Sequence, residues 1–261
     1  MQIGAQLYTV HKHTKTLEDF SDTLKKVADI GYKSVQVSGT CKFEPEWLRD
    51  ELDKNGLTCP ITHINPTRIA EETQAVVREH AVFGCTHIGI GGMPLEMRGS
   101  VEGYMEFKKI FLPAAEKMRD LGAKLMYHNH WFEFEKLDGK DVIERILEDF
   151  PEDSIDITLD LGWAAVGGAD VAELIKTLNG RLSCIHLKDW SDEPVEENDV
   201  FPVHLCPIYE GKLDYDAYIS ELSKAGCEYM LVEQDKSYGE SPFDCLKRSY
   251  ENVIKRFPDV K

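Results

Sequence analysis

A glycine recurs where a helix-like segment meets a short apolar run, and this repeat constrains the fold of the 261-residue chain most strongly. Six such junctions read "DIGYKSVQV", "KNGLTCPIT", "FGCTHIGI", "DLGAKLMYH", "LNGRLSCIH" and "KAGCEYMLV", with the glycines at positions 31, 56, 84, 122, 180 and 226. Glycine is favoured just after a helix because it adopts the left-handed conformation without steric cost. Short apolar runs are typical of strands that are buried on both faces of a parallel sheet. The pattern therefore predicts a repeated helix-to-strand unit.

A seventh junction lies between Gly122 and Gly180, where "EDFPEDSIDITLD" carries Pro151 at the end of a helix and before a strand. Apolar residues at three- or four-residue steps support the helices on either side of the repeat, at Leu17, Phe20, Leu24, Val27 and Ile30 and again at Phe243, Leu246, Tyr250, Val253 and Phe257. Seven junctions imply eight strands, which we predict near 2–8, 34–38, 58–64, 86–91, 124–130, 155–161, 182–188 and 229–235.

Eight strand–helix units without a linker or low-complexity stretch predict an α/β fold, a single (β/α)8 TIM barrel that spans residues 1–261. An open doubly wound sheet of similar content is the main competing architecture. Its dinucleotide-binding form would place G-x-G-x-x-G after the first strand, where this chain has "LYTVHKH". We therefore favour the barrel.

The composition narrows the range of partners and compartments. A formal net charge of −17 disfavours nucleic acids and anionic membranes, which carry the same sign. The start "MQIGAQLYTV" lacks the features of a signal peptide, and no apolar segment approaches the length of a membrane span. Seven scattered cysteines without a Cys-x-x-Cys pair predict free thiols in a reducing cytoplasm.

Polar residues gather at the predicted carboxyl ends of the strands, where barrel enzymes carry their chemistry. They are Gln6 and Tyr8, His63, His128 and His130, Asp160, His186 and Lys188, and Glu233 and Asp235. Strand residues two apart share a face, so each such pair can point inward together. Adjacent strands 5 to 8 would thus bring together two imidazoles and two carboxylates, those of His128, Asp160, His186 and Glu233. This donor set predicts one divalent ion, Mn²⁺, Co²⁺, Zn²⁺ or Fe²⁺ rather than Cu⁺ or Ca²⁺.

Each of these residues also has an ordinary structural interpretation. A single buried His or Asp at a strand end is usually satisfied by a hydrogen bond, so the metal prediction depends on all four together. The aromatic residues of "YHNHWFEF" either pack the rim of the barrel or stack on a sugar ring. Glu133 is an alternative fourth ligand or an outer support. Lys188 is either a catalytic acid or the partner of Asp189 or another carboxylate.

These motifs resemble the xylose isomerase-like TIM barrels, a group of sugar isomerases and epimerases that also contains endonuclease IV. The similarity runs through "GAQLYTV", "GYKSVQV", "YHNHWFEF", "LDLGW", "HLKD", "EGKLD" and "LVEQD". The resemblance implies a metal held by Glu, Asp, His and Glu from strands 5 to 8. Asp160, His186 and Glu233 match that set, whereas the first glutamate falls on His128. Trp163 is a second departure, since many relatives have histidine in "LDxGH", and "YHxH" with "HLKD" is also similar to inosose dehydratases.

The resemblance implies an isomerase or epimerase that acts on a sugar or keto-sugar. In the epimerase scheme two glutamates move protons on opposite faces of the substrate, and here Glu233 is the one evident carboxylate base. The reaction is then either a one-base isomerisation or an elimination in which Lys188 or His63 protonates the departing oxygen. Tyr8, His130 and Trp163 would contact the substrate.

Three alternatives remain at this point. The first is a metal-dependent lyase, either an inosose-type dehydratase or an enzyme that cleaves keto-sugar glycosides. The second is a DNA-repair nuclease, which the net charge of −17 disfavours. The third is a barrel that binds sugar without turnover, which the loss of the first glutamate keeps open. The substrate is expected to be a small sugar, and the lack of a glycine-rich phosphate loop favours an unphosphorylated one. The family resemblance also implies a homo-oligomer.

Overall fold

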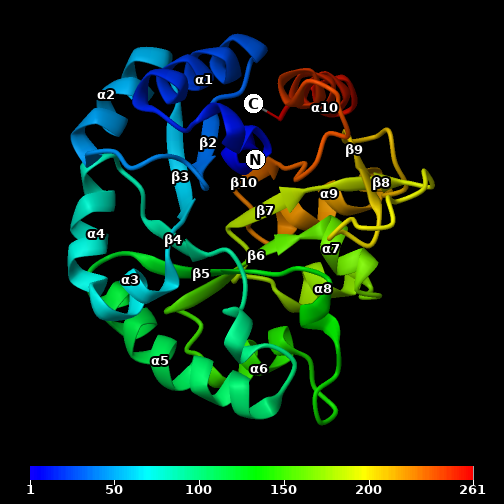
Figure 1. Ribbon diagram of the computed structural model, residues 1–261. Coiled ribbons are helices and arrows are strands. Elements are labelled where there is room, and N and C mark those ends of the chain that lie inside the picture. Colours follow the sequence, from blue (N-terminus) through cyan, green and yellow to red (C-terminus); the bar gives the residue numbers. More distant parts are fainter. Residues whose placement is uncertain (261) are drawn as a thin grey trace.

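Eight parallel strands close into a barrel that helices surround in the computed structural model, which describes residues 1–260 (Figure 1). The order around the barrel is β1-β10-β7-β6-β5-β4-β3-β2, so the first and last barrel strands pair with each other. The strands are β1 (Gln2–Gln6), β2 (Ser34–Val37), β3 (Thr58–His63), β4 (His87–Ile90), β5 (Lys124–His128), β6 (Ile155–Asp160), β7 (Cys184–Leu187) and β10 (Tyr229–Val232). The predicted (β/α)8 barrel is confirmed, and each strand lies within its predicted range.

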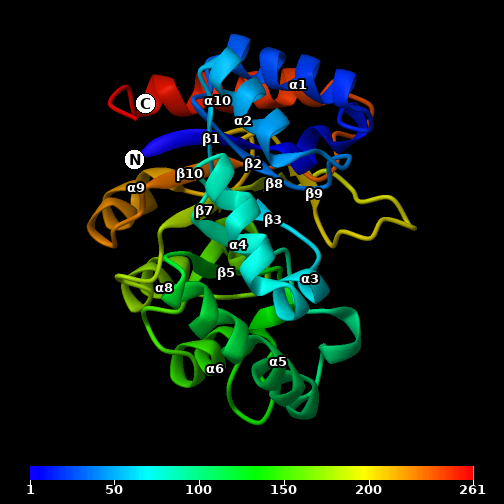
Figure 2. The same cartoon turned by 90° about the vertical axis from the view of Figure 1, so that its left-hand side faces the viewer.

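The helices cover the outside of the barrel. They are α1 (Leu17–Ile30), α2 (Pro45–Asn55), α3 (Pro66–Glu71), α4 (Thr73–Val82), α5 (Val101–Asp120), α6 (Val142–Asp149), α7 (Leu161–Val166), α8 (Val171–Thr177), α9 (Tyr215–Lys224) and α10 (Pro242–Arg256), with short 3-10 turns η1 (Leu7–His13), η2 (Leu95–Met97) and η3 (Phe132–Phe134). In α1 the Thr16 side chain accepts the N–H of Asp19 at the start, and Gly31 with a φ of 126° ends the helix. Helix α10 packs beside α1, so the two ends of the chain meet where the barrel closes (Figures 1 and 2).

The inside of the barrel is filled below the site by a small apolar cluster of Ile61, Met126, Cys184 and Leu231. These residues come from β3, β5, β7 and β10, and each is fully buried. Two residues further along the same strands stand His63, His128, His186 and Glu233. Because side chains alternate along a strand, these four point into the barrel one layer above the apolar cluster. The polar layer therefore lies on a packed floor.

Several strands end earlier than the sequence predicts, because side chains bond the backbone at the strand ends. The Gln6 side chain accepts the N–H of Tyr8 at 3.1 Å, and the chain turns into η1 instead of extending β1 to residue 8. Asp160 likewise caps α7 by accepting the N–H of Trp163 at 2.8 Å. Tyr8 therefore follows its strand, and His130, Lys188 and Glu233 likewise lie just beyond the ends of β5, β7 and β10.

A hairpin that the sequence did not predict follows β7. Strand β8 (Asp189–Ser191) pairs with β9 (His204–Cys206) in antiparallel fashion, and the segment 192–203 between them projects from the barrel (Figure 2). The buried Asp189 carboxylate holds this region by accepting five backbone N–H groups, those of Trp190, Tyr209, Gly211, Lys212 and Leu213. A Cβ on Gly211 would collide with that carboxylate. The motif "EGKLD" is therefore a loop wrapped around Asp189.

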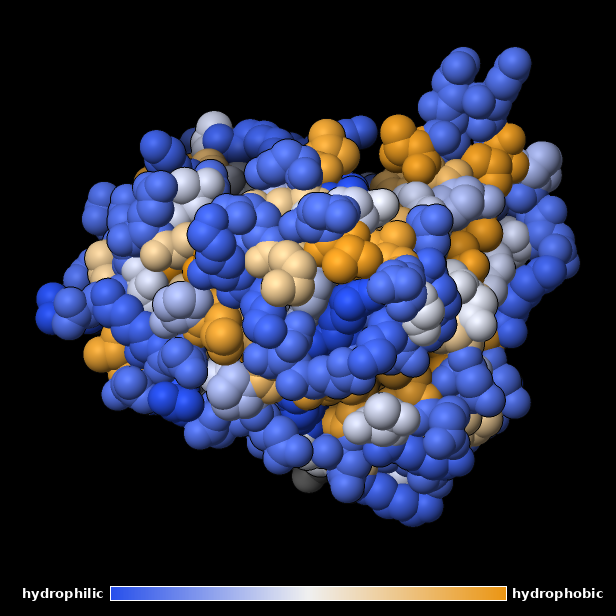
Figure 3. Space-filling view, turned by 90° about the horizontal axis from the view of Figure 1, so that it is seen from below, coloured by the Kyte–Doolittle hydropathy of each residue, from blue (hydrophilic) through white to orange (hydrophobic). Residues whose placement is uncertain are grey.

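The outer surface is mostly polar on the side of α5 and α6. Figure 3 shows hydrophilic residues over most of this face, with small hydrophobic groups scattered among them.

All seven cysteines are free thiols. Within residues 1–260, no helix combines the length and the apolar character that crossing a membrane requires.

Replacing Asp189 by alanine tests how strongly its carboxylate holds the hairpin. We expect Asp189→Ala to lower the free energy of unfolding by about 3 kcal/mol or more, because a buried N–H group that loses its acceptor costs roughly 1–3 kcal/mol, and the part-buried ones among the five can turn to water in part. Urea denaturation measures the change. The matched control is Asp192→Ala, whose side chain is 84% exposed and should shift stability by no more than about 0.5 kcal/mol. Equal midpoints for the two variants would contradict this role of Asp189.

Candidate metal centre

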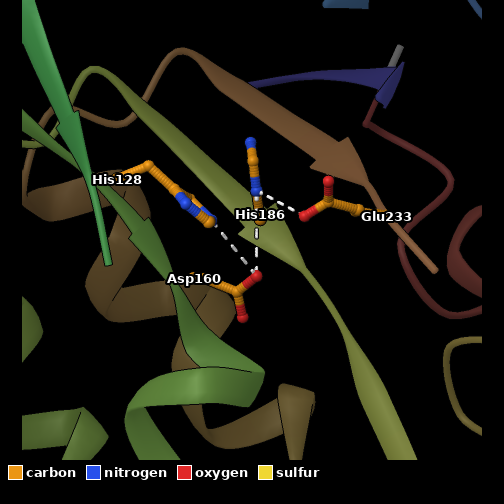
Figure 4. A group of neighbouring side chains, drawn as sticks. All are labelled: His128, Asp160, His186 and Glu233. Carbon is orange, nitrogen blue, oxygen red and sulfur yellow. Dashed lines mark ion pairs between the residues drawn. The ribbon is translucent and has the colours of Figure 1, made fainter. Parts of the chain in front are cut away.

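His128, Asp160, His186 and Glu233 converge at the carboxyl ends of adjacent strands (Figure 4). One ligand atom from each lies within 4.8 Å of all the others, and all four residues are buried. His186 Nδ1 lies 2.9 Å from Glu233 Oε2 and 3.7 Å from Asp160 Oδ2, and His128 Nε2 lies 3.5 Å from Asp160 Oδ2. The structure thus brings together the four predicted ligands.

Hydrogen bonds outside the cluster orient both imidazoles. His128 Nδ1 lies 3.1 Å from the carbonyl oxygen of Gly91, and His186 Nε2 lies 2.7 Å from Gln36 Oε1. Both partners only accept, so these nitrogens carry the ring hydrogens. Histidines that bind metals usually donate their second N–H to an oxygen in this way.

The ring nitrogens of His128 and His186 that face the cluster are placed to bind a cation. His128 Nε2 and His186 Nδ1 find no hydrogen-bond donor among residues 1–260, although both are buried. In neutral rings they present lone pairs that face carboxylate oxygens, an arrangement that calls for a positive charge between them. Burial lowers the pKa of His186, but the Glu233 and Asp160 carboxylates outweigh it and raise that pKa to about 9. The same two carboxylates would attract a divalent ion, and nitrogen and oxygen donors of this kind bind such ions.

Lys188 is buried among three carboxylates. Its Nζ lies 2.9 Å from Asp160 Oδ2, 2.9 Å from Glu233 Oε2 and 2.7 Å from Asp235 Oδ2. Burial lowers the pKa of Lys188, but the three carboxylates raise it above its usual value, so the ammonium group stays charged. Burial raises the pKa of Glu233, yet Lys188 and His186 hold it well below its usual value. Lys188 is therefore paired with these carboxylates and not with Asp189.

Two further histidines line the same layer. The ring of His63 lies 5.2 Å from that of His128 and 5.6 Å from that of His186, and the ring of His130 lies 4.8 Å from that of His128. Burial, reinforced by the neighbouring imidazole of His128, holds the pKa of both His63 and His130 well below the usual value. Both rings are therefore neutral near pH 7.

Glycines at the end of β4 make room for these two rings. A Cβ on Gly89 would lie 2.6 Å from His63 Cδ2, and one on Gly92 would lie 2.8 Å from His130 Cε1. The sequence analysis missed this role. The run "GIGG" at the end of the strand predicted near 86–91 was the available signal, because glycine in a strand often marks a close approach by another group.

Glu133 lies outside the ligand cluster. Its carboxylate accepts the Tyr127 hydroxyl at 3.0 Å and the N–H of His130 at 2.8 Å, and the Met93 N–H lies 3.4 Å away. Burial raises the pKa of Glu133 to about 7, although these hydrogen bonds act in the opposite direction. Of the two candidates for the fourth ligand, the geometry favours His128, and Glu133 instead supports the turn after β5.

The remaining predicted contacts lie farther out. Tyr8 is 38% exposed and stacks on His11 at 4.7 Å, and burial together with the Asp235 and Glu233 charges raises its pKa. Trp163 is fully buried, with Lys188 Nζ 4.5 Å above its ring and Phe201 stacked on it at 5.7 Å. Trp163 therefore links the projecting segment 192–203 to Lys188. Substrate contacts by Tyr8, His130 and Trp163 stay predictions.

Comparison with known proteins identifies the family. The chain matches the xylose isomerase-like TIM barrels over residues 24–249. It belongs to this family, as its motifs suggested. An inosose dehydratase of Clostridium perfringens is 23% identical over 247 residues, which cover 83% of this chain and 82% of that protein.

Two solved structures share the fold. A sugar phosphate isomerase/epimerase from Parabacteroides distasonis superposes with a TM-score of 0.81 at 21% identity, covering 100% of this chain and 99% of that one. A probable 3-DHS dehydratase from Bacillus anthracis gives a TM-score of 0.73 at 16% identity, with 98% of both chains covered. At these identities the similarity shows that the barrel fold is shared. The reaction has to be inferred from the residues of this chain.

Metal titration of two variants tests the ligand assignment. We expect the wild type to bind one divalent ion, His128→Ala to bind it at least about 100-fold more weakly, and Glu133→Gln to stay within about 10-fold, since an outer support matters less than a ligand. Stripping the ion should lower the melting temperature, because an ion at 100 times its Kd adds about 2.7 kcal/mol of stability. Elemental analysis and competition with a chelating dye provide the measurements. Equal affinities for wild type and His128→Ala, or a greater loss in Glu133→Gln, would refute the assignment.

Proposed function

We propose that this protein is a metal-dependent enzyme that removes the proton next to the carbonyl of a keto-sugar, with Glu233 as the base. The observation that carries this proposal is the position of Glu233, a buried carboxylate whose Oε2 lies 2.9 Å from both Lys188 Nζ and His186 Nδ1, contacts that hold its pKa well below the usual value. In Figure 4 one oxygen of Glu233 points to His186 and the other points away from the cluster. The second oxygen is therefore oriented to accept a proton from a bound substrate.

The metal would activate the substrate carbonyl, and protein side chains would move the proton. A divalent ion held by His128, Asp160, His186 and Glu233 would polarise the substrate carbonyl as a Lewis acid. Glu233 takes the proton from the adjacent carbon. The Lys188 ammonium lies 2.9 Å from the Glu233 carboxylate and offsets negative charge that develops beside it.

The replacement at position 128 favours a mechanism with one base. Epimerisation by two glutamates needs a second carboxylate opposite Glu233, and His128 stands at that position. Its Nδ1 is bonded to the Gly91 carbonyl and its Nε2 faces the cluster, so the ring has no free site for shuttling a proton. We therefore infer that Glu233 itself passes on the proton it takes, and the roles of Lys188 and His63 as proton donors stay predictions.

Of the two one-base outcomes, elimination is the one we favour. The enolate would expel a substituent from the next carbon as the C–O bond breaks, and protonated Glu233 would give its proton to the departing oxygen. A charged ammonium beside the base suits a departing oxygen that gains negative charge, and the inosose dehydratase relative points in the same direction. Isomerisation is the second candidate, because Glu233 could instead return the proton to the neighbouring carbon.

Hydrogen exchange tests the shared first step. In D2O, the Mn²⁺-loaded wild type should exchange the hydrogen next to the carbonyl of at least one of three keto-sugars, D-fructose, 3-keto-D-glucose and 2-keto-myo-inositol, followed by NMR. Glu233→Asp draws the carboxylate back by one methylene and should slow exchange on the order of 100-fold while retaining metal. Glu228→Asp, at the opposite end of the same strand, is the matched control and should exchange like wild type. Exchange at the wild-type rate in metal-loaded Glu233→Asp would remove Glu233 from this role.

Product mass then separates the two outcomes. Elimination from the substrate that exchanges should release water or another β-substituent, and mass spectrometry would record a product lighter by that group. Adding a chelator should stop product formation, and restoring Mn²⁺ should recover it. A product of unchanged mass would favour the isomerase, the activity that the sequence resemblance first implied.

A further inference from the structure

Two buried glutamines on the other side of the barrel mouth have amide groups that lack acceptors. Gln6 and Gln36 are paired in register on β1 and β2 and are 1% and 0% exposed. Within the described chain, Nε2 of each finds no hydrogen-bond partner. A buried N–H2 group without a partner destabilises the folded protein, so such a pair needs an explanation.

The orientation of both amides is set by their oxygens. Gln36 Oε1 accepts the Nε2–H of His186 from across the barrel at 2.7 Å, and Gln6 Oε1 accepts the N–H of Tyr8 at 3.1 Å. Each acceptor is therefore used, and each N–H2 group is the part left over. If His186 binds a metal through Nδ1, its Nε2 must carry the hydrogen, which fixes the Gln36 amide in this orientation.

We propose that Gln6 and Gln36 form a donor pair that binds hydroxyl oxygens of an uncharged keto-sugar, and so determines specificity in the reaction proposed above, on which this inference rests. The pair lies in the layer of the candidate ligands, because Gln36 touches His186 directly. Neutral amide donors suit hydroxyl oxygens. A phosphate group on the substrate would be repelled by the carboxylates of Asp160, Glu233 and Asp235. Lys188 would not offset this repulsion, because it is already paired with all three.

Selectivity follows from the cost of the unpaired amides. A site built to bond a hydroxyl rejects an analogue that lacks it, since the donors then stay buried and unpaired. The alternative is that ordered water satisfies both amides permanently and that they have no part in recognition. The two explanations predict different affinities when a sugar that lacks a hydroxyl is bound to the wild type and to variants at positions 6 and 36.

The test compares four Mn²⁺-loaded proteins, wild type, Gln6→Glu, Gln36→Glu and Gln2→Glu. A glutamate keeps the acceptor oxygen for Tyr8 N–H or His186 Nε2–H and removes the donor, and Gln2 is the matched control at the far end of β1. Gln6→Met, neutral and of similar size, serves if an added carboxylate prevents folding or repels the ligand. The probes are the three keto-sugars named above, together with an analogue of the tightest-binding one that lacks a hydroxyl next to the carbonyl. Calorimetry gives the affinities and elemental analysis gives the metal content.

We expect the variants at positions 6 and 36 to bind the parent sugar at least about 10-fold more weakly with unchanged metal content, and Gln2→Glu to bind it normally. The deoxy analogue should bind wild type at least about 10-fold more weakly than the parent, and the variants should discriminate less between the two. Wild-type affinity in the Gln6 and Gln36 variants would overturn this inference and leave the proposed function standing. If the wild type neither binds nor exchanges any of the three sugars, the proposed function falls together with it.

Discussion

The burial of three carboxylates in one barrel mouth is the constraint on which the rest of this site depends. Asp160, Glu233 and Asp235 surround Lys188 at 2.7–2.9 Å, so the group carries three negative charges and one positive charge. When His186 is neutral, as it must be to bind a metal, two of these charges are uncompensated, which is costly because the interior screens them far less than water does. Without an ion, the raised pKa of His186 lets a proton on its ring offset one of them. A divalent ion at the adjoining His128 and His186 nitrogens would bring the total to zero. The same ion would supply the positive charge that the inward lone pairs of both imidazoles lack.

This charge count gives the replacement at position 128 a physical meaning. The resemblance to the family implies a glutamate there, and that side chain would add a third carboxylate to the ligand set. With His128 the set holds two carboxylates, and the ion neutralises them while Lys188 neutralises Asp235. Position 128 thereby offers no carboxylate to act as a second base, and a charged ammonium group lies beside Glu233, the base that we propose. Both consequences point to chemistry that uses Glu233 alone.

The sequence predicted those parts of the fold that follow from local pattern. Glycine junctions placed the strands, and the alternation of side chains along strands 5 to 8 predicted that His128, Asp160, His186 and Glu233 meet at one barrel mouth. Strand ends were predicted too long because side chains such as Gln6 bond the backbone there, which no periodicity records. The hairpin β8–β9 was missed because its segment carries no regular pattern and depends on the buried Asp189 carboxylate.

Gln36 shows why part of the site could not be predicted from the sequence. It stands between two valines in the strand "SVQV", and nothing nearby in the chain indicates a partner. Its partner His186 lies 150 residues away in the sequence, and the two meet only because β2 and β7 face each other across the closed barrel. That contact holds a hydrogen on His186 Nε2, so in the neutral ring Nδ1 is the nitrogen that offers a lone pair to a metal, and the amide N–H2 group of Gln36 is left without a partner. One hydrogen bond across the barrel thus links the state of a candidate ligand to a donor available for a substrate.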